Sequence, residues 1–225
     1  MIQLEAGKRV GNYRITGFLA RGGFALTYLA DDEKGNQAVL KFGDVAGGGK
    51  YVARDLEITN ERRPEWISPD ETPAEAFFFR EEGVCLDFLD AHEVDALLTQ
   101  EAEILGRINH RNMVQILDVI THEGRPVLVT EYAKGKTLRE KIRNLEGIRI
   151  NWLLTIIRTL LKLQRISKLS YHGDLKPENI VIKPSGTVVM LDPAGRKDAR
   201  RMIVTTPHYN PLLFTDSRAD VMAIG

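Results

Sequence analysis

Apolar and β-branched residues are interspersed with polar ones in three short segments near the start of the chain. These segments are YRITGFLA (13–20), FALTYLADD (24–32) and QAVLKF (37–42). Gly22-Gly23 separates the first two, and the turn EKGN separates the second from the third. Short runs of this composition joined by turn residues are typical of hairpins. The sequence therefore begins with a predicted antiparallel sheet.

The next strong period is helical. Leu97, Glu101, Leu105 and Ile108 recur at i, i+4, i+8 and i+11, which places the Glu101 carboxylate in the middle of an apolar stripe. A predicted hairpin (114–124 with 126–133), a short helix (137–145), a strongly apolar helix (151–167) and a second hairpin (179–191) follow. The apolar helix is expected in the middle of a helical lobe. Strands first and helices second favour an α+β fold in two lobes.

Composition excludes several classes of function. The 225 residues are 43% hydrophobic and carry 31 basic and 31 acidic side chains, so no global charge indicates a nucleic-acid or membrane partner. Residues 51–97 are an exception, with thirteen acidic and four basic side chains, and are interpreted as a partly ordered acidic insertion. The single Cys85 excludes an internal disulfide, and no stretch reaches the roughly 18 apolar residues of a membrane span. A cytoplasmic location is expected.

One glycine-rich stretch resembles a phosphate-binding loop only superficially. GDVAGGGK (43–50) would need a glycine at position 44 and a hydroxyl residue at position 51 to match G-x-x-x-x-G-K-[ST]. The chain has Asp44 and Tyr51 instead. A flexible linker into the acidic insertion is the better interpretation.

The richest chemistry lies in YHGDLKPENIVI (171–182). Asp174 and Asn179 come before the first strand of the hairpin and Asp192 follows its second strand, so all three are expected at its open end. Two carboxylates and an amide oxygen form a set of hard ligands suited to Mg²⁺. Lys176 could direct its charge at the same anion. A solvated polar turn is the alternative for this stretch taken alone.

Together, these segments resemble the eukaryotic-like (Hanks-type) Ser/Thr protein kinase family over nearly the whole chain. The matching segments are LARGGFALTYLA (19–30), AVLK (38–41), EAEILGRINHRNMV (101–114), VTEYAKGKTL (129–138), HGDLKPEN (172–179), LDPA (191–194), TTPHYNP (205–211) and SRADVMAIG (217–225). The resemblance implies a two-lobed fold with an antiparallel sheet in the N-lobe and a partial helical C-lobe.

The resemblance also implies a role for each catalytic side chain. Lys41 would contact the α- and β-phosphates of ATP and be held by Glu101. Asp174 would accept the proton of the substrate hydroxyl, and Lys176 would neutralise the transferred phosphoryl group. Metal binding would fall to two further residues. These Mg²⁺ ligands would be Asn179 and Asp192.

A nucleotide pocket follows from the same resemblance. Ala20, Gly22 and Gly23 would form the loop over the phosphates. Thr130 would close the back of the adenine pocket, and the backbone of Glu131 and Ala133 would pair with the base. The residues expected to roof the pocket are Leu19, Thr27 and Ala38.

The sequence departs from the family pattern at four places. Ala20 and Ala25 replace two glycines of the phosphate loop, where a methyl group limits close approach of the backbone. The catalytic loop reads His-Gly-Asp, so the arginine that receives an activation phosphate in many relatives is absent; activity is expected not to depend on phosphorylation at Thr205 or Thr206. The metal loop reads Asp-Pro-Ala, and the A-P-E motif is missing.

The expected organisation is an N-lobe and hinge at 1–133, interrupted by the acidic insertion at 43–96, and a partial C-lobe at 134–225. The family continues with several helices beyond the equivalent of Asp220. We therefore expect that this chain is part of a longer polypeptide or a degenerate remnant.

Three functions remain open from the sequence. The first is ATP- and Mg-dependent phosphorylation of Ser/Thr hydroxyls on a protein substrate. The second is a pseudokinase, a nucleotide-binding or scaffolding module without transfer, favoured by Ala20, Ala25 and Pro193. The third is a small-molecule phosphotransferase, which Gly173 favours and Lys176-Pro177-Glu178 disfavours.

Overall fold

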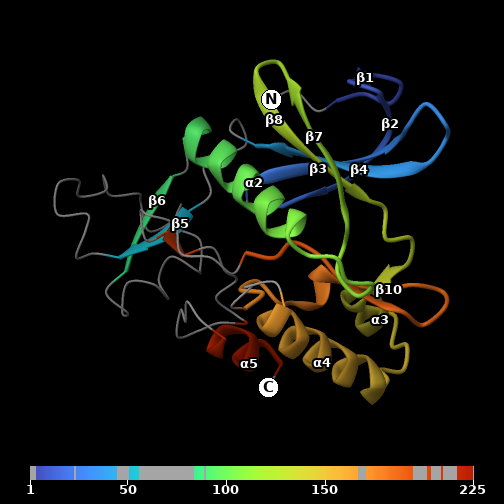
Figure 1. Ribbon diagram of the computed structural model, residues 1–225, viewed down its shortest axis with the longest axis vertical. Helices are drawn as coiled ribbons and strands as arrows, with labels where there is room; N and C mark the ends of the chain where they lie inside the picture. Colours follow the sequence, from blue (N-terminus) through green and yellow to red (C-terminus); the bar gives the residue numbers. More distant parts are fainter. Residues whose placement is uncertain are drawn as a thin grey trace. The chain divides into compact units, whose positions relative to one another are not determined.

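Six strands form the largest sheet, in the order β1-β2-β3-β4-β8-β7, with every neighbouring pair antiparallel (Figure 1). This confirms the predicted strands at 13–20, 24–32 and 37–42 and the hairpin at 114–133. The bounds are β1 (Arg9–Val10), β2 (Tyr13–Arg21), β3 (Ala25–Asp31), β4 (Gln37–Gly43), β7 (Ile116–His122) and β8 (Arg125–Glu131).

The computed structural model describes residues 4–22, 24–44, 51–55, 84–88, 90–166, 171–194, 202–203, 209 and 217–224, with backbone only for 51–55, 84–88 and 202–203. The chain divides into two compact units. Unit 1 comprises Met1–Gly49, Leu89–Thr159 and Pro177–Asp192, and unit 2 comprises Lys50–Phe88, Leu160–Lys176 and Pro193–Gly225.

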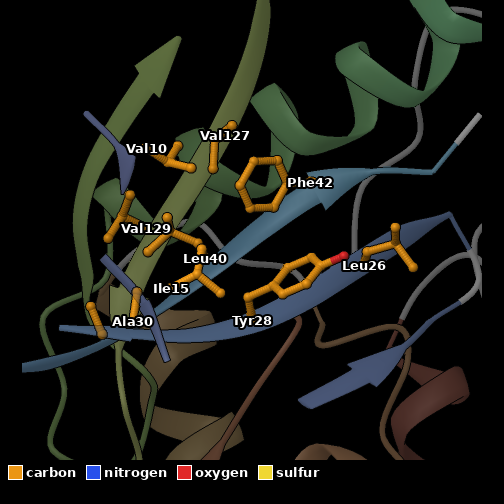
Figure 2. Close-up of a cluster of buried hydrophobic side chains, with 10 residues drawn as sticks. Val10, Ile15, Leu26, Tyr28, Ala30, Leu40, Phe42, Val127 and Val129 are labelled. Atoms are coloured by element: carbon orange, nitrogen blue, oxygen red, sulfur yellow. The ribbon is translucent and has the colours of Figure 1, made fainter. Parts of the chain in front are cut away.

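The core of unit 1 lies on one face of the six-stranded sheet (Figure 2). Alternate residues of β4, namely Ala38, Leu40 and Phe42, point into it, as the two-residue period of a strand requires. The ring of Tyr28 meets that of Phe42 edge-on, with centroids 5.5 Å apart. Ten buried residues make up the cluster: Val10, Ile15, Leu26, Tyr28, Ala30, Ala38, Leu40, Phe42, Val127 and Val129.

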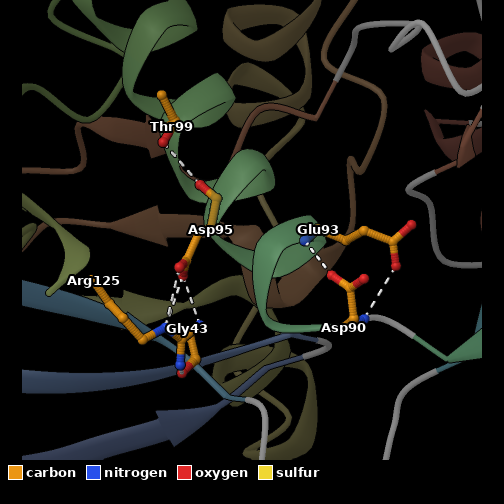
Figure 3. Close-up of polar contacts among 6 residues, drawn as sticks. All are labelled: Gly43, Asp90, Glu93, Asp95, Thr99 and Arg125. Atoms are coloured by element: carbon orange, nitrogen blue, oxygen red, sulfur yellow. Dashed lines mark hydrogen bonds and ion pairs between the residues drawn. The ribbon is translucent and has the colours of Figure 1, made fainter.

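Helix α2 (Ala91–Gly106) packs against β4, β7 and β8 of the same sheet. It begins six residues before Leu97, where the sequence period became visible, because Asp90 and Glu93 form a capping box at its start. The Asp90 carboxylate accepts from the Glu93 N–H, and the Glu93 carboxylate accepts from the Asp90 N–H (Figure 3). The first turns of α2 therefore lie inside the range expected for the insertion, 43–96.

A smaller sheet completes unit 1, in the order β11-β10-β9, with antiparallel pairs. Its strands are β9 (Lys136–Thr137), β10 (Ile180–Ile182) and β11 (Val188–Met190), which confirms the hairpin predicted at 179–191. The 3₁₀ turn η1 (Pro177–Asn179) precedes β10, and helix α3 (Leu138–Arg143) follows β9. A capping box between Thr137 and Glu140 starts α3.

Helix α4 (Ile150–Ile166) confirms the helix predicted at 151–167, but its surroundings differ from the expectation. The buried residues follow a single helical stripe, so the remaining apolar side chains lie outside it. Ile150, Leu154 and Leu161 are 67%, 38% and 52% exposed. The prediction that this helix lies in the middle of a helical lobe is therefore wrong for the face that carries Ile150, Leu154 and Leu161. The buried stripe consists of Trp152, Ile156, Thr159, Leu160 and Leu163.

Unit 2 contains a three-stranded antiparallel sheet in the order β12-β5-β6 and the helix α5 (Arg218–Ile224). The strands are β5 (Tyr51–Asp55), β6 (Val84–Phe88) and β12 (Met202–Ile203). Two of them lie within the acidic segment 51–97, which is thus ordered at least there; residues 56–83 fall outside the described ranges. Among the described helices, none combines the length and apolar character needed to cross a membrane.

Candidate nucleotide site and catalytic loop

Lys41, Glu101 and Asp192 meet in unit 1. The Lys41 ammonium, carried by β4, lies 2.7 Å from Glu101 Oε2 on α2 and 3.1 Å from Asp192 Oδ1 beyond β11. Lys41 and Glu101 are buried, whereas the Asp192 side chain is 45% exposed. The predicted pairing explains how a carboxylate occupies the apolar face of α2, because the ammonium compensates its lost hydration.

The three charges shift one another's titration. Burial lowers the pKa of Lys41, but the negative charges of Asp192 and Glu101 outweigh it and raise that pKa above its usual value. Burial raises the pKa of Glu101, and the repulsion from Asp192 adds to this, while Lys41 opposes it. One cation thus serves two carboxylates, and burial weakens the hold of Glu101 on its negative charge.

Strand alternation decides which neighbours share the face of Lys41. Thr27 lies directly opposite Lys41 in the β3–β4 ladder, and its side chain is therefore on the same face. Ala38 points the other way, into the core cluster. This position does not fit the predicted adenine contact of Ala38, whereas Val39, two residues before Lys41, shares the face. The resemblance implied Ala38 as part of the roof of the pocket, without regard to strand parity.

The residues predicted to form the phosphate loop lie where β2 turns into β3. The Gly22 N–H donates to the Ala25 carbonyl at 2.7 Å, and the Thr27 hydroxyl donates to the Ala20 carbonyl at 3.1 Å. Arg21 forms an ion pair with Asp44 at 2.6 Å, which ties the loop to the end of β4. Leu19 is half-exposed on β2. The predicted contact through Gly23 lies outside the described residues.

The predicted hinge residues follow the centre of β8. Thr130 pairs with Val39 of β4 in the ladder, and Glu131 pairs with Ala38. The Glu131 N–H donates to the Gln115 carbonyl at 2.9 Å. Ala133 is buried just beyond the strand. These positions support a hinge at the end of β8, while contact of its backbone with a base stays a prediction.

The two predicted metal ligands flank the β10–β11 hairpin in unit 1. The Leu191 N–H donates to the Asn179 carbonyl at 2.8 Å, which holds the two ends of the hairpin together. Asp192 has φ of 52°, a left-handed conformation that aspartate tolerates better than most residues. A carboxylate and an amide oxygen fit Mg²⁺, which takes few protein ligands and completes its shell with phosphate and water. The described residues contain no group of three His, Cys, Asp or Glu placed to hold a metal.

The predicted catalytic residues Asp174 and Lys176 belong to unit 2. Lys176 Nζ lies 2.7 Å from Asp174 Oδ2. The buried Asp220 of α5 accepts hydrogen bonds from the backbone N–H groups of His172 (2.7 Å) and Gly173 (2.9 Å). Gly173 has φ of 85°, a conformation that favours glycine. Because Asp174 and Asn179 belong to different units, their convergence around one metal remains a prediction.

Sequence reasoning did not assign a role to Asp220, nor did it recognise the Arg21–Asp44 pair or an Arg125–Asp95 pair. Asp220 lies 48 residues after its first partner, and no local period connects the two. The only available signal was its position at the start of a short helix. Contacts of this kind depend on the tertiary fold and are invisible in a single sequence.

Comparison with protein families matches residues 88–199 to the protein kinase domain. Sperm motility kinase 2A of Mus musculus is 31% identical over 102 residues, which are 42% of this chain and 19% of that protein. A Clostridium perfringens protein named as a probable serine/threonine-protein kinase is 26% identical over 155 residues, 62% of this chain and 22% of the relative. The chain therefore spans about a fifth of the length of these relatives.

Solved structures share the fold. The apo form of PpkA-294 aligns with a TM-score of 0.54 and 22% identity, covering 87% of this chain and 63% of that one. The kinase domain of Mycobacterium tuberculosis PknI, as its C20A mutant, aligns with a TM-score of 0.55 and 16% identity, covering 99% and 74%. The α+β, kinase-like fold predicted from sequence is thereby confirmed. Residues 88–199 match the protein kinase domain, and the chain is distantly similar to Ser/Thr protein kinases.

Proposed function

We propose that this chain transfers the γ-phosphoryl group of ATP to Ser/Thr hydroxyls of a protein substrate with the help of Mg²⁺. The observation that carries the proposal is the Lys41 ammonium lying 2.7 Å from Glu101 and 3.1 Å from Asp192. A cation held rigidly by two carboxylates is oriented before any ligand arrives. Such preorganised charge is the main source of catalysis in phosphoryl transfer.

The remaining residues supply the other parts of the reaction. Asp174 accepts the proton of the attacking hydroxyl while that oxygen bonds to the γ-phosphorus and the bond from phosphorus to the bridging oxygen of ADP breaks. Lys176, paired with Asp174 at 2.7 Å, is available to the transferred phosphoryl oxygens. Asn179 and Asp192 would hold Mg²⁺, which when bound neutralises charge on the β- and γ-phosphates.

A pseudokinase is the second candidate, and the phosphate loop favours it. Ala20 lies within β2 and Ala25 begins β3, so two positions that are glycine in the family pattern carry side chains on strands. This limits how closely backbone N–H groups approach a phosphate. A nucleotide could still bind through Lys41 and Asp192 without productive transfer.

The main argument for a small-molecule acceptor was Gly173, and the backbone geometry weakens this argument. Gly173 has a left-handed φ and donates its N–H to Asp220, which gives the glycine a backbone role whatever the acceptor. The His-Gly-Asp sequence therefore no longer discriminates between protein and small-molecule acceptors. Parallel incubation with a protein mixture and a small-molecule panel would separate the two.

The decisive experiment compares wild type with Asp174→Asn for transfer of labelled phosphate from Mg·ATP to a protein mixture. Loss of the proton acceptor should lower the rate by about 10²- to 10⁴-fold. Asp118→Asn, an equivalent change at an exposed position of β7, is the control. If wild type transfers nothing yet Mg·ATP still raises its melting temperature, the pseudokinase is correct instead.

A further inference from the structure

Arg125 connects three elements of unit 1 at the end opposite the hinge of β8 (Figure 3). It is the first residue of β8, and its Nη2 and Nε donate to Asp95 Oδ1 of α2 at 2.6 and 3.0 Å. Nε also lies 3.2 Å from Asp95 Oδ2, and Nη1 donates to the Gly43 carbonyl at the end of β4 at 3.3 Å. One guanidinium thus holds a helix and two strands.

The contacts among Arg125, Asp95 and Gly43 depend on the residue type at each position. Only arginine offers a planar fork with enough donors for both a carboxylate and a carbonyl. A Cβ at Gly43 would lie 2.5 Å from Val94 Cγ1 and 2.7 Å from Arg125 Nη2, so this close approach requires glycine. Val94 is itself buried. The start of α2 therefore packs closely against the end of β4.

The same two elements are joined a second time by Lys41 and Glu101. On β4, Lys41 and Gly43 are two residues apart and share a face. On α2, Asp95 and Glu101 are six residues apart, about 9 Å along the axis. Two attachments at different heights stop the helix from pivoting or rolling on the sheet, which a single ion pair cannot do.

We propose that Arg125 and Asp95 are positioning residues: they set helix α2 on the sheet so that the Glu101 carboxylate reaches Lys41. The catalytic relevance of this role rests on the proposed function. The role itself concerns only the geometry of the Lys41–Glu101 ion pair. Neither residue belongs to the set expected to contact nucleotide or substrate. Both act through Glu101.

The test measures how fast an amine-directed acetylating reagent modifies Lys41 in the purified chain without nucleotide, by mass spectrometry. The ammonium paired with Glu101 reacts slowly, and Glu101→Gln shows the rate when that partner is gone. Arg125→Gln and Asp95→Asn should each raise the Lys41 rate about three- to tenfold, since each removes a charge-assisted contact. The double variant should match the single ones, because the two residues act as one unit.

Two controls separate positioning from general loss of structure. Arg107→Gln removes an exposed arginine that pairs with Glu103 at 3.7 Å on the same helix, and it should leave Lys41 unchanged. Arg125→Lys keeps the charge and should restore part of the protection. A uniform rise at all lysines in Arg125→Gln would mean unfolding, and then the folded Asp95→Asn and Arg125→Lys chains decide: a rise at Lys41 alone in Asp95→Asn with partial protection in Arg125→Lys supports the inference, and an unchanged Lys41 rate in Asp95→Asn overturns it.

An unchanged Lys41 rate in folded Arg125→Gln and Asp95→Asn, with a raised rate in Glu101→Gln, would overturn the inference. This readout needs neither ATP nor phosphate transfer. If wild type proves inactive while the Lys41 rate responds as expected, the proposed function fails and the positioning role stands. If wild type transfers phosphate but the Lys41 acetylation rate does not change in the variants, the positioning role fails and the proposed function stands.

Discussion

Two groups of three charged side chains in unit 1 have the same layout with opposite signs. In one, Lys41 lies between Glu101 and Asp192. In the other, Glu146 lies between Lys136 and Lys141, 2.6 Å from each ammonium. Distances alone would rank the Glu146 group as the stronger.

Burial reverses that ranking. Lys41 and Glu101 are 8% and 6% exposed, whereas the side chains of Lys136 and Glu146 are 55% and 31% exposed. Water screens the second group and hydrates any charge left alone, so breaking it costs little. Lys41 and Glu101 have no water to replace a lost partner, and an unpaired buried charge is costly. The comparison shows that location, and not contact length, decides which ion pair matters.

The largest effect is expected from Lys41→Met. The change leaves the buried Glu101 carboxylate without its cation, which should cost about 3–5 kcal/mol of unfolding free energy. It should also abolish any rise in melting temperature caused by Mg·ATP. Urea unfolding at pH 7.5 measures the first quantity and thermal melting the second. Lys136→Met is the matched control and should cost far less, because water hydrates the Glu146 carboxylate left behind; equal losses in the two variants would refute the comparison.

A pH series on Glu101 should give the intermediate effect. Because the pKa of Glu101 is raised from 4.5 to about 7, the folded state holds this proton more tightly than the unfolded state. The resulting stability is present below about pH 4.5 and is lost as pH rises through about 7, by at most about 1.4 kcal/mol per pH unit. The corresponding rise in the pKa of Lys41 acts only above its usual value of 10.5, outside this window.

The measurement is the unfolding free energy of wild type minus that of Glu101→Gln between pH 4.5 and 8. Other titrating groups, including the histidines, cancel in the difference. Wild type should lose stability relative to the variant as pH rises. A difference that moves the other way would show that Lys41 holds Glu101 ionised more strongly than burial and Asp192 oppose it.

The smallest effect is expected from Glu146→Gln. Hydrogen bonds from Lys136 and Lys141 lower the pKa of Glu146 to about 2, so the stability it contributes is present above about pH 4.5 and is lost as pH falls through about 2. Melting curves of wild type and variant should differ slightly at pH 7 and converge near pH 2. A shift at pH 7 as large as that of Lys41→Met would contradict the role assigned to solvent.

Local patterns predicted much of the fold. The strands at 13–20, 24–32 and 37–42 and the helix at 151–167 were found because alternation and helical period are properties of neighbouring residues. The start of α2 was missed by six residues, since it is marked by the acidic capping residues Asp90 and Glu93, and Val94 is the one large apolar side chain before Leu97.

Only some residues of the candidate site were predicted correctly. Lys41, Glu101 and Asp192 could be proposed because each belongs to a recognisable segment, and the structure brings them together. Ala38 was predicted to roof the adenine pocket, although strand parity places Val39 and not Ala38 on the face of Lys41. The contacts of Asp220 and Arg125 could not be predicted, because their partners lie 48 and 30 residues away.

By itself the sequence determined the elements and the chemical types: a sheet-forming start, a helix with one carboxylate on its apolar face, and oxygen ligands flanking a hairpin. The tertiary structure decided which of these groups meet, because contact across tens of residues depends on how elements pack and not on local period. It turned one glutamate into a buried partner of Lys41 and left another, Glu146, at the surface. The difference is one of desolvation, which no count of residues along the chain contains.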